Sequence, residues 1–244
     1  MKFTYESYYQ LLKLLDEYHY HICDYADYAN YEKAAILRHD VDTSIDKAVE
    51  LAGIENTYGV HGTYFILLGT DFYNVNSRQS LEKIKVLQKL GGKIGLHFDE
   101  TKYEIKSSEK MVECILKEKA ELESSIESPI HAVSMHRPSK WILEKDIVVP
   151  GMINSYSQQF FKTFKYVSDS RRHWREDIRA IICSEEYKYL HILTHAFWYN
   201  KEEKSARECI LECIKMASKE RYLSFFDNIR DLDEFVQEGD LTNL

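Results

Sequence analysis

Short apolar strands alternate with helical segments along this 244-residue chain, and this alternation narrows its fold more than any other feature. Strand–helix alternation predicts a parallel sheet in an α/β fold. About seven strands in a chain of this size favour a distorted (β/α) barrel, with an open doubly wound sheet as the alternative. The expected strands are residues 34–40, 62–68, 93–99, 131–136, 152–156, 165–168 and 189–195, and the expected helices are 43–58, 80–90, 108–125 and 201–219.

We expect a single domain over residues 1–244, with no linker and no internal repeat. The N-terminal segment predicts an amphipathic helix over about residues 4–18 that packs on the barrel. Its apolar side chains recur at helical spacing, at Tyr8, Leu11, Leu12 and Leu15. Thr43, with Asp46 three residues later, resembles a capping box and predicts the start of the next helix.

The charge and composition exclude several classes of function. The net charge is −8, which argues against a nucleic-acid partner. No segment approaches the ~18 apolar residues of a membrane-spanning helix, and the first residues lack the apolar core of a signal peptide. Five scattered cysteines favour reduced thiols. We therefore expect a cytoplasmic protein without membrane insertion, and the oligomeric state stays open.

Two carboxylates, two residues apart, lie at the end of the first expected strand, in the stretch Leu37-Arg38-His39-Asp40-Val41-Asp42. Residues two apart on an extended chain face the same side, so Asp40 and Asp42 are expected about 6.6 Å apart along the strand. Two like charges this close do not stabilise a fold by themselves. In a metal site, however, one carboxylate can bind the metal and the other can act as the general base.

Further polar residues follow other expected strands, where the functional site of an α/β fold lies. Carboxylate and imidazole together suit Zn²⁺ or Fe²⁺. We therefore expect a divalent metal, with Zn as the first choice and Fe, Co, Ni or Mn as alternatives. The residues at these strand ends are His97, Asp99, His136, Arg137, Asp169 and His195.

Two other kinds of catalytic site find no support. The chain has no glycine-rich phosphate loop, because Lys89-Leu90-Gly91-Gly92 is typical of the turn that ends a helix. It also has no Gly-x-Ser-x-Gly elbow, so serine-hydrolase chemistry is not predicted.

Together, the motifs resemble those of the polysaccharide deacetylase (NodB-homology, carbohydrate esterase family 4-like) family, whose members are metal-dependent enzymes with a distorted (β/α) barrel. Five motifs occur in the family's order between Ile36 and Trp198. They are Arg38-His39-Asp40-Val41-Asp42, Gly62-Thr63-Tyr64-Phe65, Lys93-Ile94-Gly95-Leu96-His97, Met135-His136-Arg137-Pro138 and Leu193-Thr194-His195-Ala196-Phe197-Trp198.

The resemblance implies roles for residues in four of these motifs. In the first motif, Asp40 becomes the general base and Asp42 a metal ligand. His97 becomes a second ligand, and Arg137 forms a wall of the active site. His195 becomes the general acid.

The motifs depart from the family pattern at two places. Val41 separates two aspartates that are usually adjacent, and Thr101 stands where a second histidine usually follows His97. The third metal ligand is therefore open. We choose His136, which completes a set of two histidines and one carboxylate, and keep Asp99 as the rival.

The resemblance implies hydrolysis of an N-acyl (acetyl or formyl) amide on a sugar. Arg38 or Arg137 would keep the carboxylate of Asp40 ionised. Trp198 offers a flat face for a sugar ring, and Asp169 supports the site. A cytoplasmic enzyme meets sugar precursors, so a nucleotide- or lipid-linked sugar in surface-polysaccharide or O-antigen biosynthesis is the expected substrate.

Two alternatives stay open from the sequence alone. One is hydrolysis of a small non-sugar amide or cyclic ureide. The other is a catalytically inactive, carbohydrate-binding member of the fold.

Overall fold

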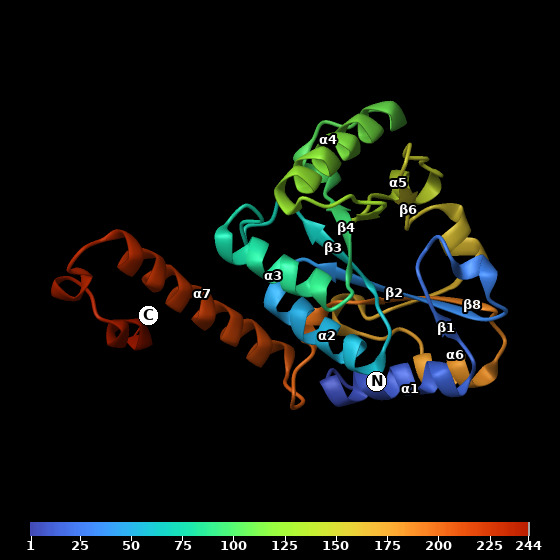
Figure 1. Cartoon of the computed structure of the whole chain (residues 1–244), viewed down its shortest axis with the longest axis horizontal. Coiled ribbons are helices and arrows are strands. Elements are labelled where there is room, and N and C mark those ends of the chain that lie inside the picture. Colours follow the sequence, from blue (N-terminus) through green and yellow to red (C-terminus); the bar gives the residue numbers. More distant parts are fainter. Residues whose placement is uncertain (244) are drawn as a thin grey trace. The chain divides into compact units, whose positions relative to one another are not determined.

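Strands and helices alternate in the computed structural model, which describes the backbone of residues 1–243 and the side chains of residues 1–241 (Figure 1). The strands are β1 His21–Ile22, β2 Ala34–Val41, β3 Thr63–Leu67, β4 Lys93–Phe98, β5 Ala132–Met135, β6 Ile153–Asn154, β7 Lys165–Ser168 and β8 Tyr189–Thr194. The helices are α1 Tyr5–Glu17, α2 Ile45–Tyr58, α3 Arg78–Lys89, α4 Ser108–Ile126, α5 Lys140–Glu144, α6 Ile178–Ser184 and α7 Ala206–Asn228.

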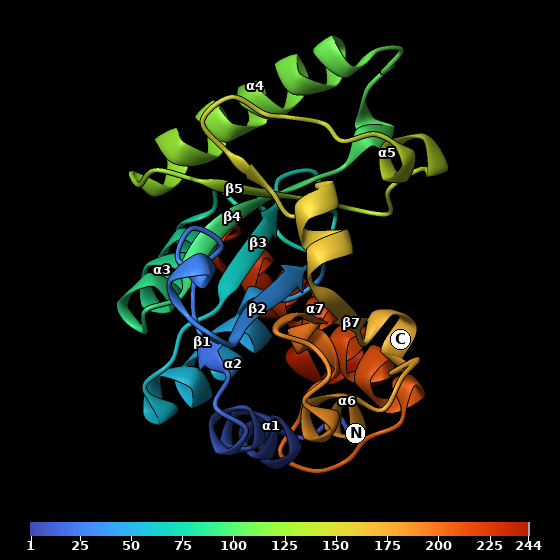
Figure 2. The same ribbon diagram turned by 90° about the vertical axis from the view of Figure 1, so that its right-hand side faces the viewer.

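Seven strands form one parallel sheet in the order β6-β5-β4-β3-β2-β8-β7, and β1 pairs with β2 beside this path. Figure 2 shows β2, β3 and β4 side by side, pointing the same way. The sheet curls into an open half-barrel that ends at β6 and β7. The expected distorted (β/α) barrel of about seven parallel strands is therefore confirmed.

The chain divides into two compact units, Met1–Glu202 and Glu203–Leu244. The sheet and helices α1 to α6 belong to the first unit, and α7 belongs to the second. The expected single domain over residues 1–244 stays a prediction.

Helix α2 begins at Ile45, two residues after the expected start at residue 43, and its N-cap lies one residue later than the sequence predicted. The side chain of Ser44, not Thr43, accepts the backbone N–H of Lys47, at 3.3 Å. The helix ends at Gly59, whose φ of 82° is the left-handed conformation that glycine adopts without strain.

The expected helix over 201–219 is wrong at both ends. Ser205 and Glu208 form a capping box, which sets the first turn of α7 at Ala206. The helix then continues to Asn228 through a second apolar run that the sequence prediction left out. The sequence prediction also missed β1, α5 and α6, and it made β6 too long.

Strand β2 is buried on both faces, and its residues alternate between two apolar clusters. Ala35 and Leu37 pack in the large core between the sheet and its helices. Ile36 packs in a smaller aromatic cluster with Phe65 and Phe160 on the other face. Because successive strand residues point to opposite faces, Arg38 shares the face of this aromatic cluster.

His39 points the other way, into a buried polar network between β2 and the first two helices. Its Nε2 lies 2.7 Å from Oε1 of Glu55 in α2. The Glu55 carboxylate also accepts the hydroxyl groups of Tyr8 and Tyr64 and the backbone N–H of Gly62. Burial raises the pKa of Glu55, but the nearby His39 and these hydrogen bonds outweigh it and lower the pKa. His39 is therefore a structural residue rather than part of the site.

Glu55→Ala is expected to destabilise the protein by about 3–5 kcal/mol, because it leaves several buried donors without an acceptor. Urea unfolding followed by circular dichroism measures this loss. Glu50→Ala is the matched control, since Glu50 is an exposed residue of the same helix. A loss below about 1 kcal/mol for Glu55→Ala would contradict the structural role of the network.

Within the described residues, no helix is both long and apolar enough to cross a membrane. The five cysteines are free thiols, as the sequence predicted.

Candidate metal centre

Three candidate ligands from three strands meet at the carboxyl edge of the sheet. Asp42 follows β2, His97 lies near the end of β4, and His136 follows β5. Oδ1 of Asp42 lies 3.1 Å from Nε2 of His97 and 3.4 Å from Nδ1 of His136. The two ring nitrogens are 3.2 Å apart. Three residues that are distant in sequence thus present one atom each to a common point.

These separations fit a metal ion. Four ligands about 2.0–2.1 Å from a tetrahedral Zn²⁺ lie roughly 3.3–3.4 Å from one another. Oδ1 of Asp42 is also buried and has no hydrogen-bond partner in the described structure. The donor set of one carboxylate and two imidazoles suits Zn²⁺ or Fe²⁺, so the residues present fit the expected divalent ion.

The ligand atoms are sheltered but reachable. The side chain of His97 is 2 % exposed, that of His136 11 % and that of Asp42 28 %. Burial raises the pKa of Asp42, but the close approach of the His136 and His97 imidazoles lowers it further than burial raises it. Asp42 is therefore a carboxylate, the form that binds a cation. The other nitrogen of His97, Nδ1, is buried without a hydrogen-bond partner among the described residues.

Asp40 lies beside the three ligands in a buried ion pair. The Arg38 guanidinium holds both carboxylate oxygens of Asp40, at 2.9 and 2.7 Å. Oδ2 of Asp40 lies 3.7 Å from Nε2 of His97. Burial raises the pKa of Asp40, and the charges of Arg38 and His97 together lower it below its usual value. Arg38 thus keeps Asp40 ionised next to the metal centre.

The position of Arg38 is set by two residues that the sequence analysis did not single out. Its guanidinium donates to the hydroxyl of Ser134 in β5 and to that of Tyr156, and it stacks 4.6 Å from the Tyr156 ring. Ser134 also donates to Asp40 at 3.3 Å. Period-two alternation back from His136 could have identified Ser134, whereas no sequence signal marks Tyr156.

His195, after β8, is oriented by Asp169, after β7. The fully buried carboxylate of Asp169 lies 2.6 Å from Nδ1 of His195 and also accepts its backbone N–H. Nε2 of His195 lies 3.9 Å from Oδ2 of Asp42. Burial lowers the pKa of His195, but Asp169, together with the charges of Asp40 and Asp42, raises it further, to about 9. His195 is therefore protonated near neutral pH.

The remaining predicted residues lie outside this cluster. Asp99 accepts the backbone N–H and the hydroxyl of Thr101, so its carboxylate caps a short turn. Arg137 is exposed, with a φ of 48°, and does not contact Asp40. Trp198 is half-buried and packs against the core and the Arg172 guanidinium. Of the two candidates for the third ligand, the structure brings His136 to the centre and not Asp99.

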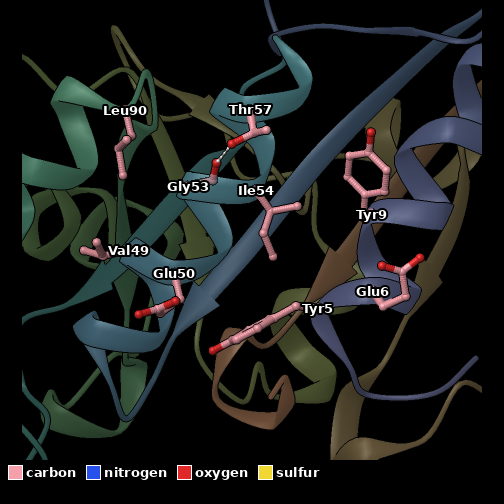
Figure 3. A pocket seen from close by; sticks show the side chains of 9 residues that line it. All are labelled: Tyr5, Glu6, Tyr9, Val49, Glu50, Gly53, Ile54, Thr57 and Leu90. Atoms are coloured by element: carbon pink, nitrogen blue, oxygen red, sulfur yellow. Dashed lines mark hydrogen bonds between the residues drawn. The ribbon is translucent and has the colours of Figure 1, made fainter. Parts of the chain in front are cut away.

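A separate groove of about 540 Å³ lies between α1 and α2 (Figure 3). Tyr5 and Tyr9 line it from α1, and Glu50 and Thr57 from α2. None of the residues at the metal centre contributes to it. This groove is therefore not part of the candidate site.

Comparison with known proteins finds similarity only among solved structures. No protein-family model matches the chain, and no curated protein matches it. A CE4 family pseudoenzyme from Bacillus anthracis is 14% identical over 78% of this chain, with a TM-score of 0.46. This chain covers only 62% of that protein's length.

Two further similar structures are described as enzymes. The Streptococcus pyogenes deacetylase PplD, in complex with acetate, is 14% identical over 79% of this chain and 81% of its own, with a TM-score of 0.44. A family 4 acetyl xylan esterase from Clostridium thermocellum, in complex with cobalt, is 14% identical over 77% of this chain and 84% of its own, with a TM-score of 0.41.

Identities near 14% and TM-scores below 0.5 say nothing about chemistry, so the activity has to be inferred from this chain's own residues. The first of these structures is described as a CE4 family protein and the last as a family 4 acetyl xylan esterase.

Proposed function

We propose that this protein is a metal-dependent hydrolase that removes an acetyl or formyl group from the nitrogen of a sugar or sugar precursor. The observation that carries the proposal is the meeting of Asp42, His97 and His136 within 3.1–3.4 Å of one another. A charged acid–base pair, Asp40 and His195, stands beside them. Hydrolysis of an amide uses all three elements.

A divalent cation held by Asp42, His97 and His136 would polarise the scissile carbonyl and make water easier to deprotonate. Asp40 is the group placed to take that proton, because Arg38 keeps it ionised. Its Oδ2 lies next to the ligands, 3.7 Å from Nε2 of His97. Asp40 therefore serves as the general base.

His195 is the group placed to protonate the leaving amine. Asp169 holds its Nδ1, so that Nε2 is free to face the centre and carries a proton near neutral pH. A group that is protonated while Asp40 is ionised supplies the acid half of the reaction. The two roles are assigned by environment, since Arg38 lies beside one residue and Asp169 beside the other.

An active enzyme is favoured over an inactive binding protein. One of the similar structures is described as a pseudoenzyme. In this chain, however, base, acid and three ligands are all present and close together. A nucleotide- or lipid-linked sugar, surface-polysaccharide biosynthesis and a cytoplasmic location stay predictions from the sequence.

The test combines metal analysis with product release. The purified wild-type protein is expected to carry stoichiometric divalent metal and to release acetate or formate from a panel of N-acyl sugars. Activity should disappear with a chelator and return with added Zn²⁺. A second panel, of small amides and cyclic ureides, tests the alternative substrates under the same conditions. Metal-loaded protein that hydrolyses neither panel would contradict the proposed function.

A further inference from the structure

The groove between α1 and α2 combines aromatic rings with carboxylates that are not paired with a basic side chain. Its lining includes Glu6 from α1 and Glu50 from α2, and it contains no lysine, arginine or histidine. Glu6 accepts a hydrogen bond from the neutral amide of Gln10, at 2.8 Å. Neither glutamate belongs to an ion pair among the described residues. The groove therefore presents negative charge to any molecule that enters it.

Tyr5 brings an aromatic ring next to this charge. Figure 3 shows its side chain reaching from α1 toward α2, on the side of Glu50. Burial, together with the charge of Glu50, raises the pKa of Tyr5 to about 12. The ammonium group of Lys47 contacts the Tyr5 hydroxyl at 3.4 Å, but it also donates to the Asn200 side chain at 2.6 Å and does not line the groove. Lys47 thus fixes the position of Tyr5 and leaves the groove without a cation of its own.

Gly53 keeps the groove open on the side of α2. Glycine inside a helix lowers its stability relative to alanine. A Cβ atom added at Gly53 would meet no atom within 4 Å, and the φ of this residue is not positive. Neither packing nor backbone conformation therefore requires glycine here. Because Gly53 lines the groove, a larger side chain at this position would fill part of it.

The lining indicates which class of ligand fits. The groove of about 540 Å³ lies within the roughly 300–1,000 Å³ of sites that hold small organic molecules. Val49, Ile54 and Leu90 offer apolar contacts beside the rings of Tyr5 and Tyr9. An anion would be repelled by the carboxylates, and a hydrated metal ion would gain nothing from the apolar side chains. An ammonium ion with apolar substituents is attracted by both the carboxylates and the faces of the rings.

We propose that this groove binds a small organic cation, with its ammonium group near Glu50 and Glu6 and its apolar part against Tyr5 and Tyr9. The inference is independent of the proposed hydrolase activity, because the groove and the metal centre share no residue. Choline serves as the probe, since its nitrogen carries a positive charge and only apolar substituents.

Isothermal titration calorimetry of the full chain compares choline with its neutral isostere, 3,3-dimethylbutan-1-ol. Choline is expected to bind with a dissociation constant of about 1 mM or lower, and the isostere about 10-fold more weakly, because it lacks the charge. Glu50→Gln should weaken choline binding by about 5-fold, the contribution of one exposed charge pair, and leave the isostere unchanged. Glu17→Gln is the matched control, since it removes the same charge from an exposed residue of α1 outside the groove.

Gly53→Leu tests whether the open space is needed. It should weaken choline binding by more than about 10-fold while the melting temperature stays unchanged or rises, because leucine forms helices better than glycine and its Cβ clashes with nothing. Circular dichroism shows whether this variant is folded. Asp42→Ala should bind choline as the wild type does, which separates the groove from a cation attracted to the metal centre.

Four results would overturn the proposal. The first is the absence of saturable binding of choline and benzyltrimethylammonium up to about 10 mM. The second is equal binding of choline and its isostere. The third is unchanged choline binding by a folded Gly53→Leu variant. The fourth is binding that depends on Asp42 and not on Glu50.

Discussion

Asp42→Ala and His97→Ala are expected to lose bound metal, with affinity falling by more than about 100-fold. Each removes one of only three protein ligands, and even outer residues around a metal site change affinity by about 10–100-fold. In the structure, the atoms removed lie 3.1 Å apart and face a common point. Metal content after dialysis, measured by plasma mass spectrometry, gives the result directly.

His136→Ala and Asp99→Ala form the matched pair for the third ligand. His136→Ala should lose metal as the first two variants do, because its Nδ1 completes the cluster. Asp99→Ala should keep it, because the Asp99 carboxylate is occupied with Thr101. The opposite pattern would make Asp99 the ligand, and full metal occupancy in Asp42→Ala or His97→Ala would overturn the assignment of the centre.

Asp40→Asn and His195→Ala are expected to keep the metal but lose about 10²–10⁴-fold in kcat, the usual contribution of a positioned base or acid. Neither residue belongs to the ligand set, so metal analysis separates them from the ligand variants. Unfolding measurements accompany Asp40→Asn, because this change leaves the buried Arg38 without a counter-charge.

The leaving group distinguishes the two roles. An activated substrate with a weakly basic leaving group needs no acid, so it should restore most of the rate of His195→Ala. The same substrate should not rescue Asp40→Asn, because water still needs a base. Equal rescue of both variants would contradict the division of roles.

Much of the site could be predicted from strand ends alone. Parallel strands place their carboxyl ends at one edge of the sheet, so His97, His136 and His195 were expected near Asp42. Alternation along β2 also places Arg38 and Asp40 on one face. The same rule shows that His39 faces away, which agrees with its pairing with Glu55.

The choice between His136 and Asp99 could not be made in this way. Both follow adjacent strands, and the decision depends on which side chain turns inward. Asp99 is engaged by its own turn, while the pairing of β4 with β5 brings His136 beside His97. Trp198, expected as a sugar platform, is half-buried beside the Arg172 guanidinium, and its role in binding a sugar stays a prediction.

The sequence by itself determined the parallel α/β architecture and the polar residues at the strand ends. It also determined which residues of a strand lie on the same face, because all three follow from short-range periodicity. Only the tertiary structure decided which strands are neighbours, that Asp169 orients His195, and that Ser134 and Tyr156 hold Arg38. These contacts join residues up to 118 positions apart. Strand order and burial decide which of these distant residues meet, and the local spacing of residues in the sequence predicts neither of them.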